Sequence, residues 1–399
     1  MELLENPVRT YSWGSRTVIA ELLGEEVPSP HPQAELWLGA HPGDPSHLVH
    51  EGTRTSLLEA ITADPVGRLG AERAERWAGR LPFLLKVLAA DEPLSLQAHP
   101  SAEQAAVGFA REDAVGLPRD APDRNYRDPS HKPELVCALT EFHALVGFRP
   151  PAATVELLAA LDVPELAPHV ALLADQPDAD GLRALFTTWI TLPQSVLDVL
   201  VPALQDGCVR LAADERFGTE ARTVLELSER YPGDAGVLAA VLLRRVTLAP
   251  GEALHLPAGN LHAYLSGAGV EVMATSDNVL RGGLTPKHVD VAELLRVLDF
   301  AAPAPPVQRG TPEGAWVRYD TPAEEFLLRR LEADGGEVPV PGDGPRILLC
   351  TAGAVGVHSG EGSVEIKRGR AVWLGPAETD VSIEVRAEGT QVFLAGDGL

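Results

Sequence analysis

One stretch in the second half of the chain decides the fold, and it reads Pro250-Gly251-Glu252-Ala253-Leu254-His255-Leu256-Pro257-Ala258-Gly259-Asn260-Leu261-His262-Ala263-Tyr264. Two leucines alternate with His255, which is the period of a half-buried strand. Pro257 and Gly259 then bend the chain just before His262. The stretch therefore predicts a hairpin, a strand and a tight turn followed by a second strand that delivers a histidine, as in a small antiparallel barrel.

Two earlier segments contain side chains that would complete a metal site with His262. Gln97 and His99 are two residues apart, so a strand would turn both to one face. Glu134 lies where charged and imidazole groups are crowded between two prolines. Together these residues offer an amide oxygen, two imidazoles and a carboxylate, a set that suits zinc and also fits manganese, cobalt or iron. Taken singly, each has a simpler interpretation. Gln97 and His99 would be ordinary polar residues of a strand, Glu134 a surface carboxylate, and His262 a histidine that is hydrogen-bonded in a turn.

The order of several motifs makes a resemblance specific. The spacing Gly, five residues, Pro, one residue, Gly, two residues, His resembles the second conserved motif of the cupin barrels, although Ser266 stands where that motif usually ends in asparagine. Six further segments occur in the order found in type I phosphomannose isomerases, namely Tyr11 to Gly14, Ala34 to Gly39, Leu81 to Leu88, Ser95 to Pro100, His131 to Leu135 and Ala274 to Arg281. Residues 7–300 of the chain thus resemble that family.

The resemblance implies a fold, a reaction and a site. It implies a cupin-type β-barrel (jelly-roll) with one zinc ion per chain, bound by Gln97, His99, Glu134 and His262, and a catalytic arginine at Arg281. The family interconverts mannose 6-phosphate and fructose 6-phosphate, which belongs to mannose metabolism and GDP-mannose biosynthesis. The expected partner is therefore a small phosphosugar.

Isomerising an aldose to a ketose requires a base that removes a proton next to a carbonyl and returns it to the neighbouring carbon. Four residues are candidates for this base, namely Lys132, Lys86, Asp277 and Glu271. The permanent charge of Arg281 suits either an enediolate or the phosphate.

Other residues near these motifs have weaker claims. His131 would assist ring opening or only fix its loop, and Lys287 would meet the phosphate or be a surface lysine. Ser95 and Trp13 are predicted to line the pocket wall.

Composition restricts the class of protein. The chain of 399 residues has 45% hydrophobic and 23% charged residues, as an ordinary globular chain of two or three domains does. A net charge of −24 argues against nucleic acid as a partner. The sequence begins with acidic residues and contains no apolar run long enough to span a bilayer, which predicts a cytoplasmic protein without a membrane partner. We expect a monomer whose three cysteines, Cys137, Cys208 and Cys350, are reduced.

Periodicity predicts a mainly β chain with an α-helical insertion. Residues 1–150 and 246–300 form the expected catalytic cupin domain, and residues 151–245 form an all-helical insertion that serves as a packed lid or buttress. Residues 301–314 are expected to be a proline-rich linker. Residues 315–399 are expected to be a second, degenerate cupin-like barrel.

An internal repeat supports the second barrel. Residues 364–374 parallel residues 246–256, but no histidine follows His358, so the second copy cannot repeat the metal site. Two alternatives to the isomerase remain open: a non-catalytic cupin that binds a sugar phosphate as a sensor or scaffold, and an isomerase for a different phosphosugar.

Overall fold

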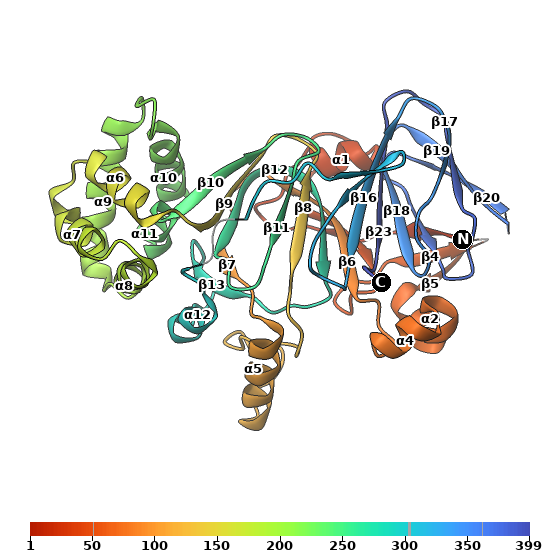
Figure 1. Cartoon of the computed structure of the whole chain (residues 1–399), viewed down its shortest axis with the longest axis horizontal. Helices are drawn as coiled ribbons and strands as arrows, with labels where there is room; N and C mark the ends of the chain where they lie inside the picture. Colours follow the sequence, from red (N-terminus) through yellow and green to blue (C-terminus); the bar gives the residue numbers. More distant parts are fainter. Residues whose placement is uncertain (51, 302–304, 361) are drawn as a thin grey trace.

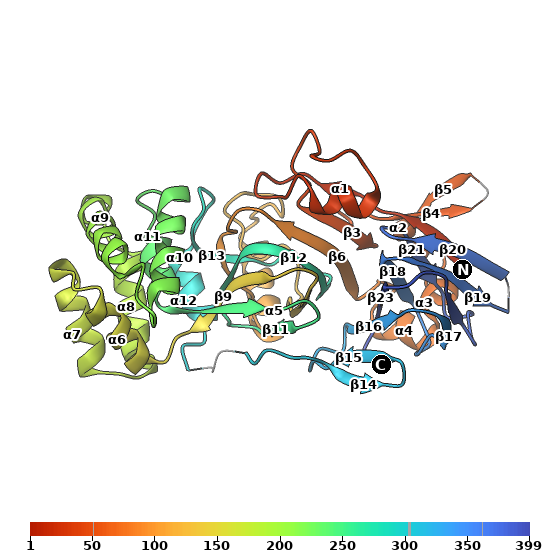
Figure 2. The ribbon, with the colours of Figure 1, turned by 90° about the horizontal axis from the view of Figure 1, so that it is seen from above.

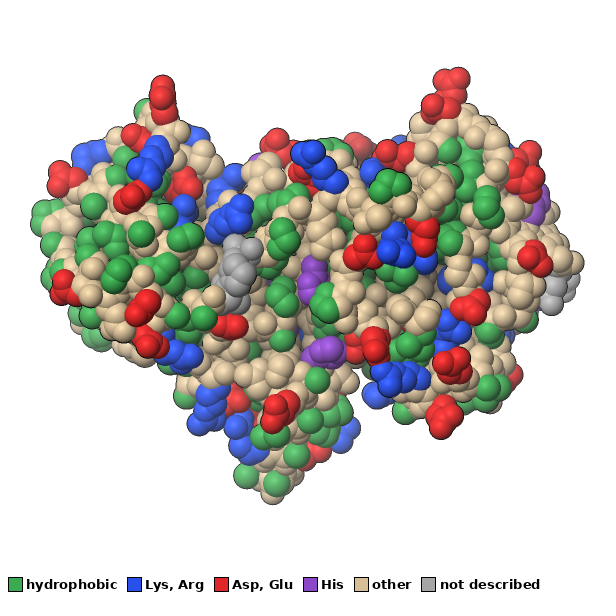
Figure 3. All heavy atoms as spheres, viewed as in Figure 1, with side chains coloured by type: hydrophobic (Ala, Val, Ile, Leu, Met, Phe, Trp, Pro, Cys, Tyr) green, Lys and Arg blue, Asp and Glu red, His purple; other side chains and the backbone are tan. Residues whose placement is uncertain are grey.

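Three parts follow one another along the longest axis of the computed structural model (Figure 1). The structure describes residues 1–50, 52–301, 305–360 and 362–399. A group of helices lies at one end, a β-barrel lies in the middle, and a second β part lies at the other end, as the view from above also shows (Figure 2). Acidic and basic side chains intermingle over the face drawn in Figure 3.

The middle part is an antiparallel sheet of ten strands that curves into a barrel, which confirms the predicted cupin-type fold. Its strands are β2 (Val8–Arg9), β3 (Glu35–Gly39), β6 (Phe83–Ala90), β7 (Leu96–Ala98), β8 (Glu134–Ala138), β9 (Phe142–Phe148), β10 (Leu243–Leu248), β11 (Ala253–Leu256), β12 (His262–Ala274) and β13 (Leu280–Gly283). The long strand β12 organises them, because it pairs with β6, β7, β8 and β9 along its length.

The stretch 250–264 forms two strands as predicted, but they do not make a hairpin with each other. Strand β11 pairs with β8, whereas β12 begins between β7 and β9. Gly259, at a φ of 77°, turns the chain away from β11 in the connection between the strands. The turn therefore carries His262 across the barrel instead of back along the strand before it.

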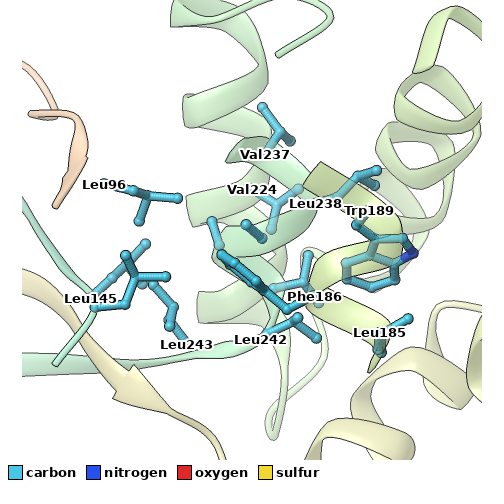
Figure 4. Close-up of a cluster of buried hydrophobic side chains, with 14 of the residues drawn as sticks. Leu96, Leu145, Leu185, Phe186, Trp189, Val224, Val237, Leu238, Leu242 and Leu243 are labelled. Atoms are coloured by element: carbon cyan, nitrogen blue, oxygen red, sulfur yellow. The ribbon is translucent and has the colours of Figure 1, made fainter. Parts of the chain in front are cut away.

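Six α-helices occupy the stretch for which the sequence predicts an all-helical insertion. They are α6 (Pro151–Ala160), α7 (Ala167–Asp175), α8 (Ala179–Ile190), α9 (Gln194–Leu211), α10 (Gly218–Arg230) and α11 (Ala235–Val241). Their apolar faces meet around Phe186 and Trp189, and Leu96 and Leu145 of the barrel belong to the same buried cluster (Figure 4). The insertion and the barrel therefore share a hydrophobic core.

Among the described residues, no single helix has the length and apolar character needed to cross a membrane. Helices α8 and α9 together reach that length, but a bend of 113° separates them.

The second β part contains two sheets. The larger sheet has nine strands, β14 (Thr311–Glu313), β15 (Trp316–Tyr319), β16 (Leu327–Ala333), β23 (Thr390–Gly396), β18 (Arg346–Ala352), β21 (Ala371–Leu374), β1 (Glu2–Glu5), β4 (His47–His50) and β5 (Thr53–Ser56). The smaller sheet has β17 (Gly336–Pro339), β22 (Ser382–Val385), β19 (Ala354–Ser359) and β20 (Gly362–Lys367). Six short helices lie around the two β parts, namely α1 (Val18–Leu23), α2 (Leu57–Ala63), α3 (Pro65–Leu69), α4 (Ala71–Arg76), α5 (Ala102–Ala114) and α12 (Val291–Val297).

The sheets do not follow the boundaries expected from the sequence. Strand β1 pairs with β21 on one side and with β4 on the other, so the beginning of the chain is part of the C-terminal sheet and not of the middle barrel. In this position Leu4 belongs to the buried cluster that contains Trp373 and Phe393, and Leu3 packs against the cluster between the two C-terminal sheets. The expected domain 1–150 thus contributes strands to both β parts.

The structure also shows where part of the expected linker and the internal repeat lie in the fold. Residues 302–304 of the expected linker 301–314 lie outside the described residues, but Gln308 exchanges two backbone hydrogen bonds of 2.8 Å with Ala253, and β14 begins at Thr311. The latter half of the expected linker is therefore attached to both sheets. Strands β20 and β21 form the second strand–turn–strand unit that the repeat predicts.

Candidate active site

Three neighbouring strands bring the predicted polar residues to one face of the barrel. Gln97 on β7 lies opposite His262 on β12 and also opposite Arg281 on β13. Directly opposed residues in antiparallel strands project on the same side of a sheet. The neighbours of Gln97 on β7, Leu96 and Ala98, are buried in the core shared with the helical insertion, as the strand period predicts.

Two imidazoles and one carboxylate converge at this face. The Nε2 atoms of His99 and His262 lie 3.3 and 3.6 Å from the same oxygen, Oε2 of Glu134. The three side chains are buried, and their ligand atoms all lie within 4.8 Å of one another. This is the grouping expected of a metal centre.

Hydrogen bonds fix the orientation of both rings. Nδ1 of His99 donates to the main-chain oxygen of Asn278 at 2.8 Å, and Nδ1 of His262 donates to that of Asn260 at 3.0 Å. A carbonyl can only accept, so each neutral ring keeps its proton on Nδ1 and its lone pair on Nε2. Both lone pairs therefore face the space beside Glu134, as metal ligands require.

The local electrostatics favour a cation at this point. Burial, reinforced by the proximity of His99, lowers the pKa of His262 to about 4, so its ring is neutral at physiological pH. Burial alone would raise the pKa of Glu134, but Lys132 and the two imidazoles lower it well below its usual range. Nε2 of His99 is buried without a hydrogen-bond partner. An ionised carboxylate with two free imidazole nitrogens fits a zinc ion.

A second buried cluster surrounds Lys86. Its Nζ lies 3.3 Å from both Glu35 and Glu271. Burial opposes the charge of Lys86, but the two carboxylates outweigh it and raise its pKa. Burial raises the pKa of Glu271, and the phenol of Tyr264 donates to that carboxylate at 2.8 Å. Lys86 is thus a fixed positive charge, which is the opposite of what the predicted role as a base would need.

An open cavity of about 530 Å³ adjoins the Lys86 cluster, because Lys86 and Glu35 line it. The predicted residues that line it are Trp13, Ser95, Lys86, Gln97, Lys132, Asp277, Arg281 and Lys287. A second cavity of about 610 Å³ shares Lys132, Asp277, Arg281 and Lys287 with it, so the two adjoin. Most of the residues singled out in the sequence therefore meet around one space.

The cavity is positively charged on one side. Burial and the charge of Arg127 together lower the pKa of Arg281, and burial with Arg281 and Arg127 lowers that of Lys287. All three cations line the second cavity. Arg127 was not among the residues predicted from the sequence, where its place beside Asp128 and Arg124 gave it the character of an ordinary surface residue.

One predicted catalytic residue that does not line this cavity, Glu271, is buried beside Lys86. The other is His131. Its Nε2 lies 2.6 Å from Glu325 of the C-terminal part, and the ring lines a separate cavity with Arg76 and Trp77. In this structure His131 joins the two β parts instead of facing the metal group.

Sequence reasoning also missed Glu35, Trp37 and His41, which support the site. Glu35 accepts from Trp37 at 2.8 Å and pairs with Lys86, and His41 lies 3.4 Å from Asp277. Only the alternation along β3, which turns Glu35 and Trp37 to one face, could have indicated the contact between these two residues.

An antiparallel barrel with two imidazoles and a carboxylate gathered in this way defines a metal-binding protein of the cupin class. The family model for the catalytic domain of type I phosphomannose isomerase matches residues 1–151. Mannose-6-phosphate isomerase of Escherichia coli (strain K12) is 38% identical over 98% of this chain and 99% of its own length. The chain belongs to the type I phosphomannose isomerase family.

Solved structures agree over the whole chain. A mannose 6-phosphate isomerase from Salmonella typhimurium, bound to its substrate fructose 6-phosphate and to zinc, has a TM-score of 0.91 at 35% identity, with 100% of both chains covered. A zinc-bound holo structure of mannose 6-phosphate isomerase has a TM-score of 0.91 at 36% identity and covers 100% of this chain and 99% of its own.

Proposed function

We propose that this protein interconverts mannose 6-phosphate and fructose 6-phosphate with one zinc ion bound per chain. The observation that carries the proposal is the convergence of His99, Glu134 and His262 next to Gln97 and Lys132, which line a cavity together with Arg281 and Lys287. The metal group suits an oxygen-rich sugar, and the cations suit its phosphate.

The zinc ion would be held by His99, Glu134 and His262, with Gln97 as a fourth ligand on the strand next to His262. When bound, zinc would supply a Lewis acid that polarises the oxygens of the substrate. Lys132 donates to the second oxygen of Glu134 at 2.9 Å and so orients that ligand.

The remaining roles follow from position and charge. Arg281, which lies opposite Gln97 in the sheet, would stabilise the negative charge of the enediolate. Lys287 and Arg127 would bind the phosphate at the cationic side of the cavity. Ser95 and Trp13 would form part of the wall against which the sugar packs.

Asp277 is the base that the structure supports best among the four predicted candidates. The contact with His41 lowers the pKa of Asp277, so the carboxylate is ionised, and its place at the cavity surface, not its basicity, supports the role. Lys86 and Glu271 are paired with each other, and Lys132 is paired with Glu134. Asp277 would take the proton from one carbon of the open-chain sugar and return it to the next.

A proton NMR time course with fructose 6-phosphate tests the activity. We expect mannose 6-phosphate to accumulate with zinc-loaded protein, to stop accumulating after chelation, and to resume when zinc is added back. Absence of conversion by zinc-loaded protein would contradict the proposal, and binding of the sugar phosphate without conversion would favour a non-catalytic role.

Replacing the base tests the mechanism. Asp277→Asn should lower kcat about a hundredfold or more, because the amide cannot accept the proton, while zinc content measured by elemental analysis stays at one per chain. Asp44→Asn is a matched control, since Asp44 pairs with Arg9 outside the metal group. An unchanged kcat in Asp277→Asn would transfer the role to another residue.

The proposal extends to the setting of the enzyme. We place it in the cytoplasm as a monomer that serves mannose metabolism, including GDP-mannose biosynthesis.

A further inference from the structure

One carboxylate of the helical insertion bonds to the loop that carries Lys287. Asp234 caps helix α11, where its Oδ1 accepts from the backbone N–H of Gly236 at 2.6 Å. The same Oδ1 accepts from the N–H of Leu284 at 3.0 Å, and Oδ2 accepts from that of Thr285 at 3.2 Å. The side chain thus holds two segments that are far apart in the sequence.

The loop needs such a partner because its backbone is strained. Leu284 is buried and has a φ of 54°, a left-handed conformation that side chains other than glycine rarely adopt. Outside a sheet ladder, its N–H depends on Asp234, since a buried unpaired N–H is costly. The carboxylate therefore stabilises a conformation that the loop does not favour by itself.

The two segments are in backbone contact. A Cβ on Gly236 would lie 2.5 Å from the nitrogen of Leu284, and one on Gly283 would lie 2.6 Å from the Cα of Gly236. Nothing larger than hydrogen fits between them. A displacement of the start of α11 would therefore be transmitted directly to the loop.

The loop leads from this contact to the cavity. The N–H of Lys287 donates to Oγ1 of Thr285 at 3.1 Å, so the residue held by Asp234 in turn fixes the backbone of the lysine. Leu284, Thr285 and Lys287 all line the cavity. The insertion also contributes Tyr231 to the cavity lining, and the phenol of Tyr231 donates to the oxygen of Pro93 at 2.7 Å.

We infer that Asp234 is a positioning residue, through which the helical insertion sets the place of Lys287 for the phosphate of the substrate. The inference rests on the proposed function. The insertion is then more than a packed buttress, because one of its helix caps determines how tightly the anionic end of the sugar is bound. Binding of a phosphate contributes equally to the ground state and the transition state, so the effect belongs in KM rather than kcat.

The test compares Asp234→Ala and Asp234→Asn with Asp178→Ala. Asp178 caps α8 of the same insertion through two backbone N–H groups and makes no contact with the loop, so its loss matches the loss of a cap alone. Equilibrium binding of fructose 6-phosphate to the zinc-loaded protein is measured by calorimetry, and KM and kcat are measured alongside.

We expect Asp234→Ala to weaken binding and raise KM about tenfold with kcat changed less than twofold, and Asp234→Asn, which keeps Oδ1, to have a smaller effect. Asp178→Ala should bind like the wild type. In the background of Lys287→Ala, the Asp234→Ala change should add little, since both act on the same contact.

Two results would overturn the inference: unchanged binding in Asp234→Ala, or an equal loss in Asp178→Ala. Because binding is measured directly, it decides the role of Asp234 even if turnover is absent. A wild-type protein that binds fructose 6-phosphate without converting it would contradict the proposed function alone.

Discussion

The ring of His262 has a free lone pair on Nε2, which water would hydrate if the ring were exposed, but the ring is buried. Burial holds its pKa at about 4, whereas the ring in the unfolded chain has the ordinary value of 6.5. Between these values the unfolded chain binds a proton that the folded metal-free protein does not, so stability falls as the pH falls from about 6.5 towards about 4. The loss amounts to about 2 kcal/mol at pH 5.

Urea unfolding of the metal-free protein at pH 7.5 and pH 5 measures this loss. His262→Gln has no ring to protonate, so its stability should change less over the same interval. Equal pH dependence in the two proteins would mean that His262 is not the group responsible. Glu134 loses its contribution to stability in a different pH range. Its pKa in the folded protein is lowered well below the usual range, so this contribution disappears only at a more acidic pH.

The residues of the site differ in how far the sequence could predict them. Gln97, His99, Glu134 and His262 are linked by motif spacing and strand alternation, and the structure brings the two histidines and the glutamate together. The pairing of Lys86 with Glu35 depends on which strands become neighbours, and that information is not local to either strand. The same holds for Arg127, whose importance arises only when its loop meets β13.

At the scale of elements, two loops are joined beneath the metal group by Asn278. Its buried side chain accepts from the N–H groups of Arg127 and Asp128 and donates to the oxygens of Asp128 and Ser130. Its own main-chain oxygen accepts from His99. The loop that follows α5 and the strand β13 are thereby held in one arrangement around a metal ligand.

Asn278→Ala should therefore lower zinc affinity about 10- to 100-fold, as loss of an outer-shell partner does, and destabilise the protein by a few kcal/mol. Competition with a chelator measures the affinity, and urea unfolding measures the stability. Asn6→Ala is a control, because the side chain of Asn6 accepts from Ser46 at 2.7 Å and Asn6 lies outside the loops that carry the ligands. A variant that is destabilised but binds zinc normally would make Asn278 purely structural.

Elements whose pattern is local were predictable from the sequence, and elements whose partners are distant were not. The helices of 151–241 follow from apolar spacing, and β11 and β12 from alternation and a glycine turn. No local pattern indicates that β11 pairs with β8, or that β1 joins β21. Strand pairing of this kind is decided by the edges left open after the rest of the sheet has formed.

At the scale of the whole molecule, the two β parts share a hydrophobic core. Phe83, Leu85 and Val270 of the barrel belong to the same buried cluster as Trp373 and Phe393 of the C-terminal strands. Ion pairs add to this contact, including Arg73 of α4 with Asp397 at 2.6 Å. We therefore expect the two β parts to unfold together.

Phe393→Ala tests this expectation. Removing a fully buried ring should cost about 3–5 kcal/mol, and the urea midpoint of zinc release should move down with that of the C-terminal part because the core is common to both. Val357→Ala, in the core between the two C-terminal sheets, serves for comparison as a smaller truncation within that part alone. Two separate transitions, with zinc release unaffected, would show that the barrel is stable by itself.

The place of β1 between β21 and β4 has a consequence for synthesis on the ribosome. Strand β1 (Glu2–Glu5) is synthesised long before β21 (Ala371–Leu374), which is one of its two partners in the sheet. Until β21 is made, the nascent chain therefore carries a strand with one edge open, and such edges are sites of mispairing. The nine-stranded sheet is thus completed only after β21 and β23 have been made, and slow translation would lengthen the period in which the chain depends on chaperones.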